Sequence, residues 1–192
     1  MPDRSPLALP PGFRIGTATS SFQVEGAADS RGPSIWDTFT ATPGVVRDGT
    51  SGATASGHHD RYVEDVALLA RLGVRDYRFS ISWPRVQPTG RGPVSTQGLD
   101  FYDRLVDELL AAGIDPMVTL YHWDLPQALE DDGGWLNRGT VGHFESFAAV
   151  VADRLADRVR HWVPVNEPNV ATMFGYAVGI HAPGRQLMFD AL

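Results

Sequence analysis

The sequence contains neither cysteine nor lysine. Without cysteine, the chain can form no disulfide and no cysteine-ligated metal centre. The 16 basic residues are therefore all arginine, and with 23 acidic residues the net charge is −7. Nucleic-acid binding requires clustered basic side chains that replace phosphate counterions, whereas these arginines are scattered along the chain. We therefore expect no nucleic-acid partner.

Long hydrophobic runs are also missing. Charged residues or glycine interrupt every apolar stretch before it approaches the roughly 20 residues of a membrane-spanning helix. The first residues, MPDRSPLALPPGF, contain no apolar core followed by a small-residue cleavage site of the kind found in signal peptides. We therefore expect no membrane segment and a cytoplasmic location. The composition, 43% hydrophobic and 20% charged, is that of a folded globular chain.

Strand patterns alternate with helix patterns along the chain. Short apolar or β-branched runs predict strands at residues 13–19, 74–82, 114–121 and 161–166. Hydrophobic residues at helical spacing predict helices at residues 60–72, 99–110 and 144–155, and a short helical turn is expected at 34–39. Gly73 and Gly113 follow the first two long helices, where a glycine commonly ends a helix. The order is therefore strand, helix, strand, helix.

Strands joined through helices of this length must be parallel, so the predicted class is α/β, with the four strands side by side in the sheet in their sequence order. Polar or aromatic runs follow the strands (SSFQVEG, SWPR, HWDLP and NEPN), and functional residues at strand ends favour a (β/α)₈ barrel over a doubly wound sheet. GTATSS, after the first strand, lacks the glycine spacing of a dinucleotide site. Four strands cannot close a barrel, which needs eight strands and typically about 250 residues. We predict an N-terminal tail at residues 1–12 and, at 13–192, the N-terminal half of a TIM barrel with about four β/α units.

Ordered blocks along most of the chain resemble glycoside hydrolase family 1. They are GTATSSFQVEG at residues 16–26, WDTF at 36–39, YVED at 62–65, LGVRDYRFSISWPRVQP at 72–88, TLYHWDLPQALE at 119–130, GGW at 133–135, NEP at 166–168 and HAPG at 181–184. The resemblance implies a retaining β-glycosidase, commonly a β-glucosidase, on a (β/α)₈ barrel that needs no cofactor or metal. The implied partners are a β-glycoside or oligosaccharide substrate and the missing C-terminal half of the barrel.

Retaining hydrolysis uses two carboxyl groups about 5–5.5 Å apart, one as the nucleophile and one as the acid and then the base. The resemblance makes Glu167, in NEP, the acid/base. Taken alone, Glu167 would more simply be a carboxylate at the start of a helix. The family nucleophile lies on a seventh strand in a Thr/Ile-Glu-Asn-Gly context. That context surrounds none of the other glutamates, which are Glu25, Glu64, Glu108, Glu130 and Glu145.

Sugar recognition requires side chains that hydrogen-bond hydroxyls, together with aromatic rings that face the pyranose. The resemblance places Gln23, His122 and Asn166 at glycone-binding positions, while Trp123 would form a wall of the pocket. Arg78 resembles the arginine beneath the nucleophile, which favours the ionised form of that carboxyl. The simpler alternatives are a surface amide for Gln23, a core histidine for His122 and a turn residue for Asn166. Arg78 could equally form a structural ion pair, and Trp123 could be ordinary core.

Two local features depart from these patterns. Pro164 removes a backbone donor inside the fourth predicted strand, so we expect a local irregularity there. His58, His59 and Asp60 could suggest a metal site. Adjacent histidines without a partner one helical turn away are more often solvated loop residues, and we expect these to be so.

Three hypotheses follow from the sequence. The chain is a part of a β-glucosidase whose other half carries the nucleophile, or it is a sugar-binding, catalytically inactive half-barrel. In the third, the chain is a structural half-barrel that assembles with a second copy to supply eight strands. The sequence beyond residue 192 would separate the first from the other two.

Overall fold

The computed structural model describes residues 9–188, and its centre is a four-stranded sheet. The strands are β1 (Gly16–Ala18), β2 (Asp76–Ser80), β3 (Asp115–Tyr121) and β4 (His161–Val165). They lie in the order β1-β2-β3-β4 and every pair is parallel. The predicted strand order is confirmed, although β1 is shorter than its apolar run. The predicted N-terminal tail, residues 1–12, falls mostly outside the described residues.

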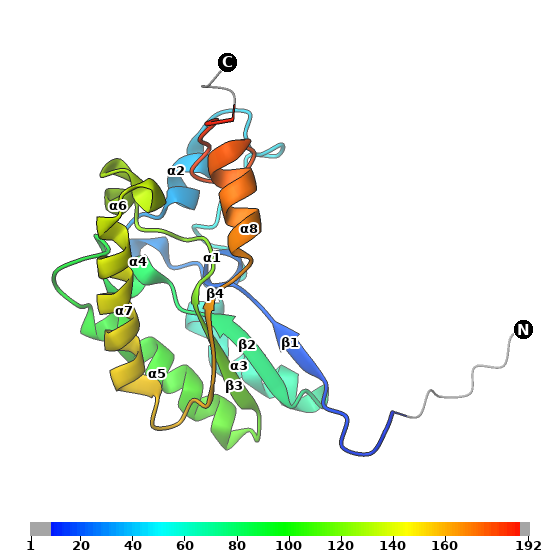
Figure 1. Cartoon of the computed structure of the whole chain (residues 1–192). Coiled ribbons are helices and arrows are strands. Elements are labelled where there is room, and N and C mark those ends of the chain that lie inside the picture. The colour runs from blue at the N-terminus through cyan, green and yellow to red at the C-terminus, as the bar shows by residue number, and fades with distance from the viewer. Residues whose placement is uncertain (1–8, 189–192) are drawn as a thin grey trace, which may run out of the picture.

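Long helices connect the strands, and short helices gather beyond the carboxyl ends of the strands (Figure 1). The long helices are α3 (His58–Arg71), α5 (Thr96–Ala111) and α7 (Gly139–Leu155). The short ones are α1 (Ser21–Val24), α2 (Ile35–Ala41), α4 (Trp83–Val86), α6 (Gln127–Asp131) and α8 (Pro168–Val170). The remaining helical segments of the described residues are two 3₁₀ turns, η1 (Ala28–Ser30) and η2 (Gly134–Leu136), and a π-helical segment, η3 (Ala171–Ala177). None of the helices in residues 9–188 is both long and apolar enough to cross a bilayer.

The hydrophobic core lies between one face of the sheet and the long helices. Successive strand residues point to opposite faces, so Tyr77 and Phe79 share the face that packs against the helices. Helix α5 contributes a continuous buried stripe: Phe101, Tyr102, Leu105, Val106 and Leu109. Each fully buried side chain of this size contributes about 1.5–3 kcal/mol, so this packing fixes the sheet against the helices.

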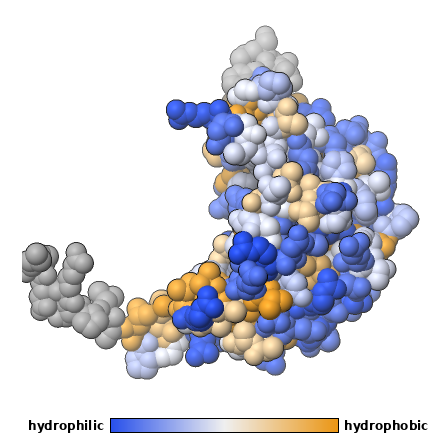
Figure 2. Space-filling view, turned by 180° about the vertical axis from the view of Figure 1, so that it is seen from behind, coloured by the Kyte–Doolittle hydropathy of each residue, from blue (hydrophilic) through white to orange (hydrophobic). Residues whose placement is uncertain are grey.

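The opposite face of the sheet is more open. Ala18 is exposed, and Met117 and Val163 are half-buried. Ahead of β1, three apolar side chains are 47%, 60% and 49% exposed: Leu9, Phe13 and Ile15. Figure 2 shows a hollowed outline with hydrophobic surface gathered towards the N-terminal end of the described chain. A contiguous apolar surface of this kind is typical of a face that docks against further protein.

The irregularity expected at Pro164 does not interrupt β4. The strand continues from His161 to Val165, and Val163 and Val165 on either side of the proline pair with β3. Pro164 itself is exposed and is left out of the paired positions. Proline lacks a backbone N–H and is tolerated on an edge strand, which is the position of β4 among the described residues.

The expectation that His58 and His59 are solvated loop residues is wrong. Both residues belong to the first turn of α3, and the His58 side chain is only 6% exposed. His58 Nδ1 lies 2.7 Å from Asp65 Oδ2, and its ring contacts the ring of Tyr77. The apolar sheet face therefore covers His58, an effect of tertiary packing that the local polar sequence does not reveal. Within residues 9–188 no group of three or more potential metal ligands comes together.

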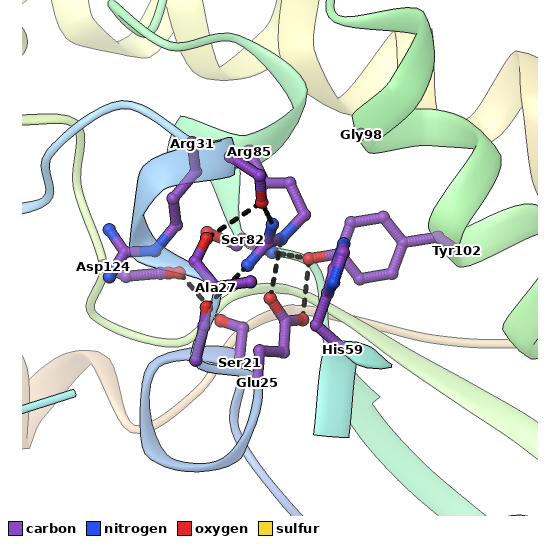
Figure 3. Close-up of polar contacts among 12 residues, drawn as sticks. Ser21, Glu25, Ala27, Arg31, His59, Ser82, Arg85, Gly98, Tyr102 and Asp124 are labelled. Atoms are coloured by element: carbon purple, nitrogen blue, oxygen red, sulfur yellow. Dashed lines mark hydrogen bonds and ion pairs between the residues drawn. The ribbon is translucent and has the colours of Figure 1, made fainter. Parts of the chain in front are cut away.

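A buried ion pair joins the segment after β1 to the segment after β2 (Figure 3). Arg85 Nε donates to Glu25 Oε2 at 2.9 Å, and the two side chains are 1% and 5% exposed. Tyr102 donates its hydroxyl to Glu25 Oε1 at 2.8 Å. The remaining guanidinium nitrogens donate to Ser30 Oγ and to the carbonyl of Gly26. Because every charged atom has a partner, these loops are tied to α4 and α5 without an unpaired buried charge.

Arg85→Met should destabilise the chain by about 3–5 kcal/mol, because Glu25 would then be a buried charge without its ion-pair partner. Urea unfolding measures this cost. Arg91→Met is the matched control, since it breaks an exposed pair with Asp132 and should cost less than about 1 kcal/mol. Equal effects of the two substitutions would contradict a structural role for the buried pair.

Candidate functional site

The side chains predicted to form the site follow the carboxyl ends of three strands of the sheet, β1, β3 and β4. Gln23 lies in α1, directly after β1. His122 and Trp123 follow β3, and Asn166 and Glu167 follow β4. The carboxyl ends of parallel strands meet at one edge of a sheet, and in barrel enzymes the active site forms at this edge. The parallel pairing thus brings residues more than 100 positions apart into one region.

Asn166 is the centre of the hydrogen bonds in this region. Arg78, in β2, donates from Nη1 to Asn166 Oδ1 at 2.9 Å. That contact orients the amide so that Nδ2 faces His122 Nε2 at 3.3 Å and Glu167 Oε2 at 3.4 Å. Trp123 donates its indole N–H to the carbonyl of Asn166 at 2.8 Å. Asn166 is 9% exposed, so a buried amide links the ends of β2, β3 and β4.

Two residues of the site adopt left-handed backbone conformations that are uncommon for residues other than glycine. Trp123 has φ of 76° and Glu167 has φ of 44°. Such conformations cost about 1–3 kcal/mol each and persist only where the surrounding structure holds them. The indole of Trp123 donates to the carbonyl of Asn166, the residue before Glu167, and this hydrogen bond helps to hold both conformations. Both turns redirect the chain immediately after a strand.

Glu167 is exposed, and its setting differs from that of an ordinary carboxylate at the start of a helix. It occupies the N-cap position of α8, yet its side chain makes no capping hydrogen bond. Helix α8 itself has three residues before the π-helical segment η3 begins. The carboxylate is therefore free of a capping role and lies beside Asn166 at the open end of the sheet.

A pocket of about 410 Å³ opens beside these residues. Gln23, His122 and Trp123 line it, whereas Asn166 and Glu167 do not. Asn166 is linked to the pocket through its contacts with His122 and with the indole N–H of Trp123. Gln23 accepts from Ser20 Oγ at 2.8 Å and forms none of the hydrogen bonds that centre on Asn166. The structure thus unites the predicted residues in two adjoining groups. The remaining lining residues are Ser20, Phe22, Trp36, Thr40, Val46, Thr50, Ser51, Gly52, Ala55 and His181.

Three ring-bearing residues of the pocket wall, Phe22, Trp36 and His181, were not predicted as site residues from the sequence, whereas Trp123 was. The rings of Trp36 and Trp123 each lie 5.7 Å from the ring of His181, measured between centroids. Phe22 lies 6.0 Å from Trp36. Trp36 and His181 belong to the WDTF and HAPG blocks, so the ordered motifs contained a signal for them. Apolar ring faces beside amide and imidazole groups are suited to a ligand with both hydroxyl-bearing edges and apolar faces.

Burial dominates the electrostatics of His122. Burial, and then the positive charge of Arg78, lowers the pKa of His122 to about 4, while the negative charge of Glu167 opposes the shift. His122 is therefore neutral at pH 7 and can accept a hydrogen bond through one ring nitrogen. A neutral imidazole between an arginine and a carboxylate suits the recognition of an uncharged polar ligand.

Asp124, the residue after Trp123, is a second perturbed group and was not predicted from the sequence. Complete burial raises the pKa of Asp124 to about 7, and the charge of Glu25 acts in the same direction. A hydrogen bond from Ser21 Oγ to Asp124 Oδ2, 2.8 Å long, partly offsets the effect of burial. This acid lies beneath the pocket wall rather than in the pocket.

Substitutions beside His122 should move its pKa in opposite directions. Arg78→Gln removes a neighbouring positive charge and should raise the pKa of His122 from about 4, whereas Glu167→Gln removes a negative charge and should lower it. A histidine titration by NMR measures both shifts, and the spectrum of His122→Gln identifies the resonance. Shifts of the same sign in the two variants would refute this arrangement of charges.

Comparison with known proteins places the chain in a family. The sequence profile of glycosyl hydrolase family 1 matches residues 6–191. Beta-glucosidase A of Thermotoga maritima is 48% identical over 185 residues, which is 95% of this chain and 42% of the relative. Thermostable beta-glucosidase B of Thermobispora bispora is 54% identical over 178 residues, covering 93% of this chain and 37% of the relative. The chain spans less than half the length of these curated relatives.

Solved structures agree with the sequence relatives. The family 1 β-glucosidase of Thermotoga maritima superposes with a TM-score of 0.89 at 49% identity, over 93% of this chain and 40% of that one. The same enzyme has been solved in complex with castanospermine and with deoxynojirimycin, at the same TM-score. The four parallel strands and the three long helices correspond to part of a TIM barrel, as the strand pattern predicted. Because the profile covers nearly the whole sequence, the chain belongs to glycosyl hydrolase family 1.

Proposed function

We propose that these residues are part of an enzyme that hydrolyses terminal β-linked glucosyl, or related, residues from β-glycosides with retention of configuration. In this proposal the chain supplies the acid/base and part of the glycone site. The names of the relatives support the substrate class, since several are β-glucosidases. The observation that carries the proposal is the placement of Glu167, an exposed carboxylate without a capping role, next to Asn166 at the carboxyl edge of a parallel sheet.

In the proposed reaction, Glu167 begins as the protonated acid. It gives its proton to the glycosidic oxygen while a second carboxylate attacks the anomeric carbon and forms a glycosyl-enzyme. Glu167, now ionised, then removes a proton from water, which attacks the same carbon and releases the sugar. The exposure of Glu167 at the open end of the sheet suits both steps, because the leaving group and the water must each reach it.

The adjoining pocket is proposed to bind the glycone. Gln23, neutral His122 and the amide of Asn166 offer donors and acceptors for ring hydroxyls, and Trp123 offers an apolar face. Among residues 9–188, the side chain of Arg78 makes one hydrogen bond, from Nη1 to Asn166. We propose that its positive charge also favours the ionised form of the nucleophile.

The second carboxylate is proposed to come from a further segment that carries the remaining barrel strands. Glu25 is held by Arg85 in the buried network, and Glu130 is held by Tyr176 and Arg185. The other glutamates lie on the long helices: Glu64 on α3, Glu108 on α5 and Glu145 on α7. None of these glutamates, which all lie within the described residues, takes part in the hydrogen bonds among Asn166, His122 and Glu167.

One observation favours a second candidate function, that of a sugar-binding half-barrel without catalysis. The pocket lined by Gln23, His122 and Trp123 forms within residues 9–188 and does not include Glu167. The open edges of β1 and β4 would also allow a second copy to pair with the sheet. Such a module would bind a β-glucoside, dissociate it unchanged, and elute as a dimer if it self-assembled.

The purified chain alone should not hydrolyse p-nitrophenyl β-D-glucoside, because no second carboxylate faces Glu167 in the described residues. Joining it to the C-terminal part of a family member, such as beta-glucosidase A of Thermotoga maritima, should restore turnover. Glu167→Ala should then reduce kcat/KM by at least about 100-fold, the lower range for general acid–base catalysis. The loss should be larger for an alkyl glucoside than for a dinitrophenyl glucoside, whose leaving group departs without a proton.

Glu145→Gln on α7 provides the control, since it removes a glutamate remote from the site and should leave kcat/KM unchanged. Hydrolysis by residues 1–192 alone that persists in Glu167→Ala would overturn the assignment. Binding of the glucoside without turnover in the joined protein would instead favour the sugar-binding module.

A further inference from the structure

We propose that Asp124 is a positioning residue for the sugar pocket: through Ser21 it holds α1, which carries Gln23, against the segment that carries His122 and Trp123. The identity of the ligand as a sugar rests on the proposed function. The mechanical link itself rests only on the contacts of buried side chains.

The link is a short chain of hydrogen bonds between buried residues, and Figure 3 shows its contact between Ser21 and Asp124. Ser21 Oγ donates to Asp124 Oδ2 at 2.8 Å, across 103 positions of sequence. The backbone N–H of Ser21 donates to Ser80 Oγ at 2.8 Å, and Ser80 Oγ donates to Ser21 Oγ at 3.1 Å. All three residues are at most 3% exposed. One serine therefore joins the end of β2 to the segments that follow β1 and β3.

The residues on each side of this link line the pocket. Asp124 directly follows Trp123, whose left-handed φ of 76° must be held by its surroundings. Ser21 is the first residue of α1, and the next two residues, Phe22 and Gln23, line the pocket. A change at Asp124 would alter the spacing between Gln23 on one side and His122 with Trp123 on the other. Asp124 touches no pocket surface itself, so its role is to position other residues.

No neighbouring charge neutralises Asp124. The facing charged groups are Arg31 after η1 and Glu25 at the end of α1. Arg31 is already paired with Asp37 of α2 through two hydrogen bonds of 2.6 and 2.8 Å, and Glu25 is paired with Arg85 of α4. Asp124 Oδ1 is buried and has no hydrogen-bond partner among the described residues. A neutral carboxyl fits these surroundings better than a carboxylate does.

The first test compares Asp124→Asn, Asp124→Leu and Ser21→Ala in the chain itself, without any sugar. Two NMR signals report the pocket geometry: the indole N–H of Trp123, which donates to Asn166, and the titration of His122. Asp124→Asn retains an acceptor oxygen for Ser21 and should leave both signals unchanged. Asp124→Leu and Ser21→Ala should shift the indole signal and raise the pKa of His122, because a displaced loop admits water. Asp103→Asn, on remote α5, is the matched control.

Unchanged Trp123 and His122 signals in folded Asp124→Leu and Ser21→Ala would overturn the proposal. Far-UV circular dichroism shows whether each variant folds. If Asp124→Leu does not fold, Ser21→Ala decides, since it removes one hydroxyl and leaves the acid in place. Rescue by Asp124→Asn separates a requirement for the hydrogen bond from a general requirement for bulk at this position.

The second test measures binding of methyl β-D-glucoside by saturation-transfer NMR. Ser21→Ala should weaken binding by about tenfold, because it removes the buried hydrogen bond to Asp124 that holds Gln23 in place. Asp124→Asn should bind as the wild type does. Gln23→Ala should weaken binding without moving the Trp123 signal. If the wild-type chain binds no glucoside, the sugar-binding part of the proposed function fails, and the spectroscopic test still decides the role of Asp124.

The pH dependence of the chain's stability should show whether the buried carboxyl of Asp124 carries a proton. Because the pKa of Asp124 rises from 3.8 to about 7 on folding, the folded chain binds this proton more tightly than the unfolded chain does. That stabilisation is complete below about pH 4 and is lost as the pH rises through about 7. The melting temperature of the wild type should therefore fall relative to that of Asp124→Asn between about pH 5 and about pH 8. A constant difference between the two would show that Asp124 does not titrate in this range and would overturn the neutral state.

Discussion

The parallel pairing of four strands is the constraint on which the site depends. Side chains that follow β1, β3 and β4 meet because these strands point the same way and end at one edge of the sheet. Asn166 then fixes how these side chains lie relative to one another, since its amide bonds to Arg78 and faces both His122 and Glu167. An antiparallel neighbour would send one of these groups to the opposite end of the molecule.

Buried polar contacts hold the loops that the sheet alone would leave free. Arg85 and Glu25 form an ion pair in which every charged atom has a hydrogen-bond partner. This pair ties the segment after β1 to α4. Asp124, by contrast, has one bonded oxygen and one without a partner, and burial raises its pKa to about 7. The same loop is therefore held at one point by paired charges and at another by a carboxyl that is most stable when neutral.

Much of the architecture was predictable from local sequence patterns. Alternating strand and helix periodicities predicted the class and strand order, and the glycines after two helices marked their ends. The patterns could not predict that tertiary packing buries His58 or that β4 stays paired with β3 on both sides of Pro164. The pocket walls and the link from Ser21 to Asp124 also arise from contacts between segments about 100 positions apart, which local periodicity does not encode.

We propose that one sugar is held by residues from three strand ends, with Glu167 at the bond to be broken. The most direct measurement is a crystal structure of this chain, joined to the C-terminal part of a family member, with deoxynojirimycin bound. We expect Gln23, His122 and Asn166 to lie within hydrogen-bond distance of ring hydroxyls, and Glu167 to lie next to the anomeric position. An inhibitor bound away from these residues, or a Glu167 carboxylate directed towards the helices, would contradict it.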